Sequence, residues 1–249
     1  MIINKEILRY KNGEIQKIVD KIVDEIYLRI FVNNRELIIL GILPEKIEYF
    51  VYGFLFTNGI IKNLSEIKSL KLSGNLCFVE IENPLVDEFL QSMKNLNSGC
   101  GSAYISFKKE GKIENKLKIL SEKILYLKNN FEKMSKIYKE TGSVHSCGLS
   151  DHENIIIFAE DISRHNAFDK VIGEGLFKNL NFEDKILLTS GRITSDITTK
   201  CVKVKIPVIV SISAPTYYAL KIAEFYNITL IGFARGNRFN IYTCNWRVI

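Results

Sequence analysis

The second half of this sequence alternates between continuous apolar runs and segments of helical periodicity, which restricts the possible folds more than any other feature. Apolar runs at 155–158, 186–188 and 206–212 precede helical segments at 166–180, 194–204 and 215–225, and runs at 228–233 and 239–242 follow. Strands that are apolar throughout are buried on both faces, which is typical of parallel sheets whose strands are joined by helices. The pattern predicts an α/β fold with a mostly parallel sheet flanked by helices.

The first part of the chain predicts a smaller α/β domain. Two β-prone runs, 26–32 and 36–40, flank Asn33 and Asn34 and predict a hairpin. The elements expected after it are a helix over 47–56, a strand over 76–81 and a short helix over 86–93. We therefore expect three parts: an N-terminal domain over 1–97, a mobile loop over 98–112 and a C-terminal domain over 113–249.

A long helix is expected at the start of the C-terminal domain. Apolar residues recur in steps of three and four from Leu117 to Tyr138, which places them on one stripe. The stripe can pack against the chain's own sheet or form the seam of a dimer. Residues 107–140 contain ten lysines and five glutamates, a balance of +5 against a net charge of +6 for the chain. Such interleaved charges are typical of a solvated helix face, and a surface that guides anionic partners is the alternative.

Composition excludes several classes of protein. The chain has 249 residues, of which 47% are hydrophobic, and this is enough apolar material for a core without disulfides. No apolar run approaches the roughly 18 residues that a membrane span needs, and the N-terminus lacks the apolar region of a signal peptide. Aromatic residues and arginines do not cluster in the lysine-rich segment, which argues against nucleic-acid binding. We expect a cytoplasmic protein without membrane or nucleic-acid partners.

The cysteines do not form a recognisable framework. They are Cys77, Cys100, Cys147, Cys201 and Cys244, and no pair has the C-x-x-C spacing. Their odd number and wide spacing argue against a disulfide scaffold and against a structural zinc site. Cys100 differs from the others because it lies between Gly99 and Gly101 in a polar segment, where packing gives no reason for a thiol. A reachable nucleophile and an incidental loop cysteine are both compatible with this position.

Polar and glycine-containing segments follow the apolar strands. They are 160–166, 189–192, 213–216 and 232–238. If the strands are parallel, these segments lie at one edge of the sheet, with three helix N-termini and the arginines Arg164, Arg192, Arg235 and Arg238. Helix N-termini and guanidinium groups both bind phosphate oxygens, so the edge predicts a site for a phosphorylated ligand. Each segment alone also fits an ordinary turn, and His165 either hydrogen-bonds its turn or faces the ligand.

Several of these segments, taken in order, resemble the FdhD/NarQ family of formate dehydrogenase accessory proteins. The matching segments are 141–145, 160–161, 164–167, 169–170, 190–192, 211–216, 232–236 and 238–242, with 53–55 and 59–61 near the N-terminus. The resemblance covers roughly residues 25–243, and so many pieces in the same order make chance similarity improbable.

The resemblance implies a cytidine-deaminase-like C-terminal fold and a homodimer. It implies a sulfurtransferase that takes persulfide sulfur from a cysteine desulfurase and passes it to the molybdenum bis-molybdopterin guanine dinucleotide cofactor of formate dehydrogenase. GDP is a candidate mimic of that cofactor's nucleotide end. The family's persulfide cysteine falls on Cys100. Its cofactor-binding stretch falls on Phe233, Ala234, Arg235, Gly236, Asn237 and Arg238. The strand ends add Ser190, Gly191, Arg192 and His165.

One departure from the family pattern affects the mechanism. The family commonly has a C-G-x-C loop, whereas Ala103 replaces the second cysteine here. Cys100 is therefore expected to hold the persulfide alone, with His165 or Asp161 assisting as a proton donor or acceptor. A cofactor chaperone that binds the dinucleotide without sulfur transfer is the alternative. A zinc deaminase is disfavoured, because H-x-E and P-C-x-x-C are both missing.

Overall fold

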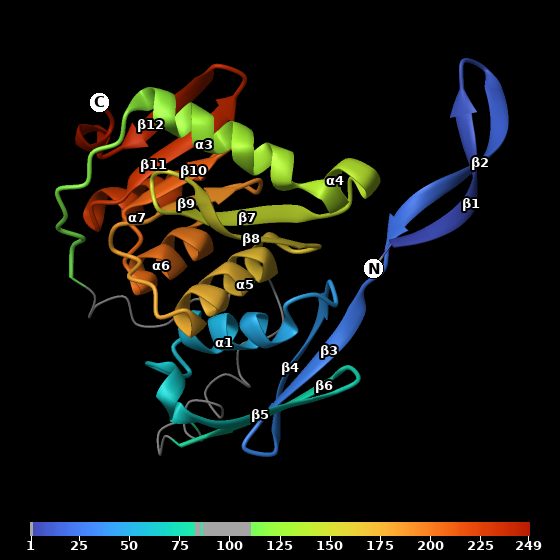
Figure 1. Cartoon of the computed structure of the whole chain (residues 1–249), viewed down its shortest axis with the longest axis horizontal. Coiled ribbons are helices and arrows are strands. Elements are labelled where there is room, and N and C mark those ends of the chain that lie inside the picture. Colours follow the sequence, from blue (N-terminus) through green and yellow to red (C-terminus); the bar gives the residue numbers. More distant parts are fainter. Residues whose placement is uncertain (1, 83–85, 87–110) are drawn as a thin grey trace.

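The computed structural model describes residues 2–82, 86 and 111–249, which form three sheets (Figure 1). The expected helix over 86–93 and the loop over 98–112 that carries Cys100 lie outside the described residues, apart from Val86 and residues 111–112. Within the described part, no helix is both long enough and apolar enough to cross a membrane.

The largest sheet has six strands in the order β12-β11-β10-β9-β7-β8. Its strands are β7 (His145–Ser150), β8 (Ile155–Asp161), β9 (Ile186–Thr189), β10 (Val208–Ser211), β11 (Thr229–Arg235) and β12 (Arg238–Thr243). The connecting helices are α5 (Arg164–Phe177), α6 (Ser195–Val204) and α7 (Tyr217–Phe225). The alternation of strands and helices expected from the sequence is therefore confirmed.

The expectation of a mostly parallel sheet was wrong, because the sheet is mixed. Only β9–β10 and β10–β11 are parallel pairs, whereas β7–β8, β7–β9 and β11–β12 are antiparallel. The difference comes from β7, which inserts between β8 and β9. Its sequence, His-Ser-Cys-Gly-Leu-Ser, is not a continuous apolar run and predicts no strand. Because β7 is antiparallel to both neighbours, β8 still points in the same direction as β9, β10 and β11.

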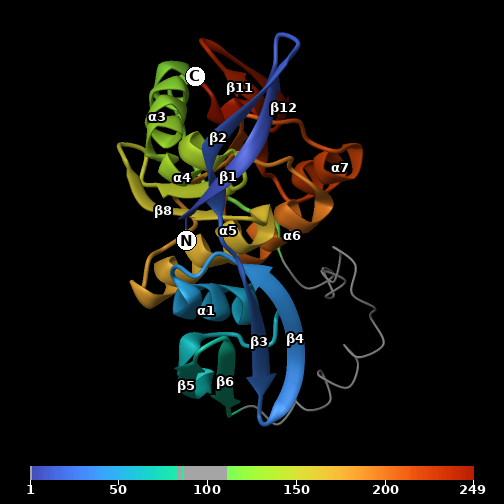
Figure 2. The ribbon, with the colours of Figure 1, turned by 90° about the vertical axis from the view of Figure 1, so that its right-hand side faces the viewer.

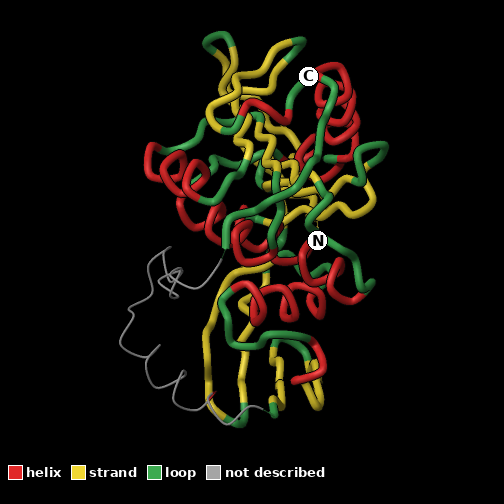
Figure 3. The backbone as a smooth tube through the Cα atoms, turned by 90° about the vertical axis from the view of Figure 1, so that its left-hand side faces the viewer, coloured by secondary structure: helices red, strands yellow, loops and turns green. Residues whose placement is uncertain are grey.

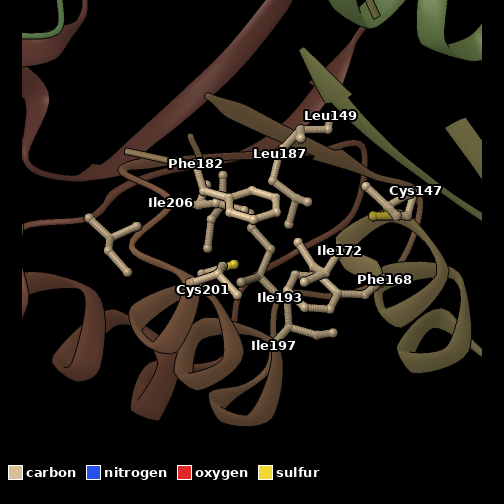
Figure 4. Packing of buried hydrophobic residues seen from close by; sticks show 14 of the residues in the cluster. Cys147, Leu149, Phe168, Ile172, Phe182, Leu187, Ile193, Ile197, Cys201 and Ile206 are labelled. Carbon is tan, nitrogen blue, oxygen red and sulfur yellow. The ribbon is translucent and has the colours of Figure 1, made fainter. Parts of the chain in front are cut away.

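Helices cover both faces of the six-stranded sheet. On one face, the core between the sheet and helices α5, α6 and α7 includes Phe168, Ile172, Leu187 and Cys201 (Figure 4). On the other face lies α3 (Ser121–Met134), whose apolar stripe packs against the sheet. Its buried side chains Ile124, Leu127 and Phe131 share a core with Ile186, Leu188, Val208 and Val210. The apolar stripe therefore packs against the chain's own sheet.

The long helix expected over 117–138 begins only at Ser121 and is divided at Ser135 into α3 and the short α4 (Lys136–Thr141). The Ser135 hydroxyl lies 2.8 Å from the hydroxyl of Ser146 on β7. The carboxylate of Glu160 on β8 accepts hydrogen bonds from the backbone N–H groups of Ile137 and Tyr138, both at 3.0 Å. A carboxylate at a helix N-terminus accepts hydrogen bonds from backbone N–H groups that have no partner within the helix. The first turn of α4 is therefore stabilised by a residue of the sheet.

The smaller, four-stranded sheet has the order β4-β3-β6-β5. Its strands are β3 (Ile26–Val32), β4 (Arg35–Ile42), β5 (Ile67–Ser73) and β6 (Leu76–Ile81). The hairpin at Asn33 and Asn34 is confirmed, and both residues adopt the positive φ that such a turn requires. The helix α1 (Ile47–Thr57) covers this sheet as expected, whereas β5 was not predicted.

The two larger sheets are joined through α1 and α5, which lie between them (Figures 2 and 3). Gly53 and Gly173 allow this close approach. A Cβ atom on Gly53 would lie 1.9 Å from the carbonyl oxygen of Asp169, and one on Gly173 would lie 1.8 Å from that of Tyr49. The resemblance at 53–55 therefore has a physical reason, since no larger residue fits at Gly53.

Two buried ion pairs complete this joint. The ammonium of Lys170 lies 2.7 Å from Asp161, and it also donates to the carbonyl oxygen of Leu43 at 3.0 Å. Lys200 donates to both carboxylate oxygens of Asp169, which also accepts a 2.8 Å hydrogen bond from Thr57 at the end of α1. The Asp161 carboxylate itself accepts a 3.1 Å hydrogen bond from the backbone N–H of Leu43. Because each carboxylate bonds a lysine beside the six-stranded sheet and a residue beside the four-stranded sheet, the joint is held by hydrogen-bonded charges as well as by packing.

The first strands form a separate hairpin that projects from the body of the molecule (Figure 1). β1 (Ile2–Lys11) and β2 (Glu14–Val23) pair with each other and with no other described strand. Most of their side chains are exposed, including Leu8, Tyr10 and Ile15. An ion pair of 2.8 Å between Lys21 and Glu140 links β2 to α4.

Candidate functional site

The candidate site lies at the carboxyl edge of the six-stranded sheet. Strand pairing sets His145 opposite Asp161, Cys147 opposite Thr189, and Thr189 opposite Ser211, so these positions are close to one edge. The helices α5, α6 and α7 all begin just after the strands β8, β9 and β10 that end there. The expectation that the polar segments share one edge is met even though the sheet is mixed, because the intervening β7 is antiparallel to both of its neighbours.

Ser190 links the start of β7 to the end of β9. Its hydroxyl oxygen accepts a 2.9 Å hydrogen bond from the backbone N–H of Ser146 and lies 3.3 Å from Nδ1 of His145. Its backbone N–H donates to the carbonyl oxygen of Ser146 at 3.0 Å. These contacts fix the His145 ring beside the predicted Ser190–Gly191–Arg192 segment.

Gly191 allows an arginine to cross the edge. The side chain of Arg164 lies directly over Gly191, and a Cβ atom there would approach Arg164 Cδ to 2.8 Å. The Gly191 carbonyl oxygen accepts a 2.7 Å hydrogen bond from the Ser211 hydroxyl, which ties this loop to the end of β10. Arg192 follows as an exposed residue. Both guanidinium groups lie close enough to His145 to lower its pKa.

The predicted cofactor stretch forms the end of β11 and its turn into β12. Arg235 and Arg238 lie opposite each other across this turn, where Gly236 adopts a positive φ of 55° and both Gly236 and Asn237 are exposed. The Arg235 guanidinium carbon lies 5.5 Å from the centre of the Phe233 ring, and its Nε donates to the Ile212 carbonyl oxygen at 2.7 Å.

Ala234 is the member of this stretch that faces away from solvent. Its side chain is fully buried in the core beneath α3, so it can contribute only backbone groups to a ligand site. Phe233, by contrast, is partly exposed and adopts a positive φ of 50° within an irregular part of the strand. The Phe233 backbone N–H donates to the carbonyl oxygen of Ser213 at 3.0 Å, so Phe233, like Arg235, contacts the segment that follows β10.

The two histidines of the edge are held neutral. Burial lowers the pKa of His165 to about 3, and the nearby Arg164, Lys200 and His145 act in the same direction. Burial also lowers the pKa of His145, assisted by Arg164 and Arg192. The Nε2 atom of His165 is 4.0 Å from the carboxylate of Asp196. The arginines are therefore the main source of positive charge at this edge.

Some polar atoms of the edge are buried without partners. Among the described residues, the Nε of Arg164, the Nε2 of His165 and the Oγ1 of Thr194 have no hydrogen bond. Buried polar groups are nearly always paired in native proteins, and exceptions concentrate at functional sites. All three atoms lie at the starts of α5 and α6, where the sequence predicted an anion site.

The described cysteines are poor nucleophiles. Cys77, Cys147 and Cys201 are buried and Cys244 is partly buried. Burial raises the pKa of the Cys77 thiol to about 12, with Glu48 acting in the same direction, and burial raises the pKa of the other three thiols as well. Because the thiolate is the reactive form, none of these four is prepared for sulfur chemistry. Cys100 lies outside the described residues.

The sequence placed Arg164 among the arginines of this edge but gave His145 no role in the site. His145 begins a strand that the sequence does not predict, so its position beside Ser190 depends on the pairing of β7 with β9. Arg164 occurs in the 160–166 segment, but its placement over Gly191 is a long-range contact. The sequence signal for both residues is that His145 and Arg164 lie in segments that resemble a known family. Among the described residues, no group of three or more His, Cys, Asp and Glu side chains is arranged to hold a metal ion.

Comparison with known proteins identifies the family of this chain. The sequence model of the FdhD/NarQ family matches residues 23–249. The chain belongs to this family. The resemblance inferred from the ordered segments is thereby confirmed, and the match extends through both larger sheets.

Named relatives of this family cover nearly the whole chain. The sulfur carrier protein FdhD of Bacillus subtilis (strain 168) is 35% identical over 247 residues, covering 96% of this chain and 94% of its own. The sulfur carrier protein FdhD of Staphylococcus aureus (strain MRSA252) is 34% identical, covering 99% and 96%. A crystal structure of a candidate formate dehydrogenase accessory protein from Desulfotalea psychrophila superimposes with a TM-score of 0.83 at 25% identity, covering 100% and 99%.

Proposed function

We propose that this FdhD/NarQ family member is a sulfurtransferase that accepts persulfide sulfur from a cysteine desulfurase on Cys100. The sulfur passes to the molybdenum bis-molybdopterin guanine dinucleotide cofactor, which formate dehydrogenase requires. The names of the relatives, which are sulfur carrier proteins, support this proposal. The proposal also includes a cytidine-deaminase-like C-terminal fold and a cytoplasmic location. It further includes a homodimer, and light scattering of the purified protein tests this oligomeric state.

The carboxyl edge of the six-stranded sheet carries the proposal. The proposed acceptor of the sulfur is a cofactor with several negatively charged phosphate groups. The edge offers four arginines beside the N-termini of three helices, namely Arg164, Arg192, Arg235 and Arg238. Guanidinium groups and helix N-termini bind phosphate oxygens through charge-assisted hydrogen bonds. The donor set therefore fits the pyrophosphate groups of a dinucleotide.

The assignment of the carrier to Cys100 is supported by the other cysteines. The four described thiols are buried or partly buried and have raised pKa values, so they are unsuited to attack a persulfide. In the proposed step, the Cys100 thiolate attacks the terminal sulfur of the desulfurase persulfide. The donor's S–S bond breaks, the donor cysteine leaves as a thiolate, and Cys100 becomes the persulfide.

The sulfur-carrier role is tested by mass spectrometry after incubation with a cysteine desulfurase and cysteine. We expect the wild-type chain to gain the mass of one sulfur atom and Cys100→Ala to gain none. Cys244→Ala is the matched control, because Cys244 is the most accessible of the described cysteines, and it should load like the wild type. Equal loading of Cys100→Ala, or no loading of the wild type, would contradict the proposal.

A cofactor chaperone without sulfur transfer is the second candidate, and Ala103 favours it because the loop lacks a second thiol. Activation of formate dehydrogenase in cells that lack the native gene separates the two. If the protein is a chaperone, Cys100→Ala should activate formate dehydrogenase fully and Arg238→Ala should not. The sulfur carrier predicts that both variants fail.

A further inference from the structure

The solvent-facing side of α7 is unusually aromatic for a helix on the outside of a protein. Tyr217, Tyr218 and Phe225 are 73%, 64% and 62% exposed, and they are three of the five exposed residues of this helix. The opposite side packs into the core of the sheet through the buried Ala219 and Ala223. The outer side of a surface helix usually carries polar residues, whereas clustered exposed aromatic rings are typical of protein–protein interfaces.

Two lysines lie against the rings at the two ends of this aromatic stripe. The ammonium nitrogen of Lys221 is 4.8 Å from the centre of the Tyr217 ring, and that of Lys112 is 5.8 Å from the centre of the Phe225 ring. Neither lysine forms an ion pair within the part of the chain that the structure describes. Together with the exposed Glu224 they give this surface a net charge of +1. Both ammonium groups are therefore available to carboxylates of a partner.

This surface is called the α7 face below, and it consists of Lys112, Tyr217, Tyr218, Lys221 and Phe225. It lies on the outside of the six-stranded sheet, away from the four-stranded sheet (Figure 2). The helix α3 provides a contrast. Its exposed Tyr126 also lies against a lysine, with Lys123 at 4.7 Å, but that lysine forms an ion pair with Glu153. Tyr126 is also the one aromatic residue among the exposed residues of α3, so α3 presents no comparable stripe.

The α7 face is close to where the chain continues from Cys100. The backbone N–H of Ile113 donates to the carbonyl oxygen of Tyr226 at 3.0 Å, directly after the end of α7. Cys100 precedes Lys112 by twelve residues, and twelve residues of chain span at most about 40 Å. Cys100 is therefore tethered to one end of the α7 face. A protein that binds this face holds its own reactive sulfur within the range of that tether.

We infer that the α7 face is the docking surface for the protein that donates persulfide sulfur, and that the donor meets it with carboxylates around apolar side chains. This inference rests on the proposed function, in which a cysteine desulfurase loads Cys100. It adds where the donor binds and which side chains hold it. The aromatic rings supply most of the binding free energy when they are buried, and the lysines orient the donor and speed its encounter.

The rate at which a cysteine desulfurase with cysteine loads sulfur onto the full chain tests the inference, with the chain well below the concentration that saturates the desulfurase. Tyr218→Ala/Phe225→Ala removes two exposed rings, and we expect loading to slow by at least about tenfold. Lys112→Glu/Lys221→Glu should also slow loading, most strongly at low salt. Cysteine persulfide is a small donor that needs no docking surface, so it should load both variants at the wild-type rate.

The matched control is Tyr126→Ala on α3, which the desulfurase should load at the wild-type rate. If the desulfurase loads Tyr218→Ala/Phe225→Ala as fast as the wild type, the docking surface is refuted and the carrier role stands. Conversion of a dimer to monomers in that variant, with an unchanged loading rate, would assign the α7 face to a second copy of the chain instead.

The two sulfur donors separate the remaining outcomes. If cysteine persulfide also loads Tyr218→Ala/Phe225→Ala slowly, the rings act on the fold or on Cys100 rather than on docking, and the inference is refuted. If neither donor loads the wild type, the proposed carrier function itself is refuted.

Discussion

Two charged regions of this protein contrast sharply, although both involve residues of α5. In the joint between α1 and α5, Asp161, Lys170, Asp169 and Lys200 are buried, and each charge has an opposite partner within 2.7 Å. At the carboxyl edge, cationic side chains gather near neutral histidines, and Arg164 Nε has no described partner. Structural charges are paired within the chain, whereas charges of a binding site are left available to a ligand.

The contrast predicts opposite effects for one kind of substitution in the two regions. Lys200→Met leaves the carboxylate of Asp169 buried without its cation, so we expect a loss of about 3–5 kcal/mol in the free energy of unfolding. Urea denaturation measures it. The double variant Lys200→Met/Asp169→Leu should recover most of the loss, since no charge remains buried. If the free energy of unfolding of Lys200→Met is within about 1 kcal/mol of the wild-type value, this ion pair does not have the proposed structural role.

The second prediction concerns acid stability and the buried His165. Its pKa is about 3 in the folded chain against an ordinary 6.5, so between these values the unfolded chain binds more protons. The free energy of unfolding should therefore fall as the pH drops from 6.5 toward 3, by up to about 1.4 kcal/mol per pH unit from this group.

The matched variant for this measurement is His165→Gln. Because other groups also titrate in acid, the comparison is between the slopes of wild type and variant in urea denaturation across the same pH window. The variant should show the shallower slope. Equal slopes would mean that His165 is protonated as readily in the folded chain as in the unfolded one.

The third prediction is the counterpart of Lys200→Met at the carboxyl edge. Arg164→Met retains an unbranched side chain over Gly191 and removes an unpaired polar atom, so stability should stay within about 1 kcal/mol of the wild type or rise. Binding of inorganic pyrophosphate should weaken in the same variant. A large loss of stability would show that Arg164 is structural, like Lys200.

The smallest effect is expected where an ion pair is exposed. Lys21 and Glu140 link the projecting β1–β2 hairpin to α4, with side chains that are 53% and 43% exposed. Glu140→Gln should change the free energy of unfolding by no more than about 0.5 kcal/mol, and less at high salt. A larger change would mean that the hairpin depends on this contact.

Much of the fold could be predicted from local patterns. The hairpin at Asn33 and Asn34, the helix α1 and the strands β9, β10 and β11 follow the expected ranges closely, since apolar runs and turn residues mark them. The strand β7 could not be predicted, because Ser, Cys and Gly form a strand only where neighbours supply the pairing. The break at Ser135 also depends on a distant residue, the carboxylate of Glu160.

For the candidate site, the sequence by itself determined which residues follow the strands: Ser190, Gly191, Arg192 and the stretch from Phe233 to Arg238. Tertiary structure alone decided that His145 joins them, that Arg164 crosses Gly191, that Ala234 is buried, and that a cavity opens beside Ser190. The physical reason is that periodicity and turn chemistry act over a few residues. Strand direction, burial and the pairing of charges depend on residues that are far apart in the chain, and only the folded structure brings these together.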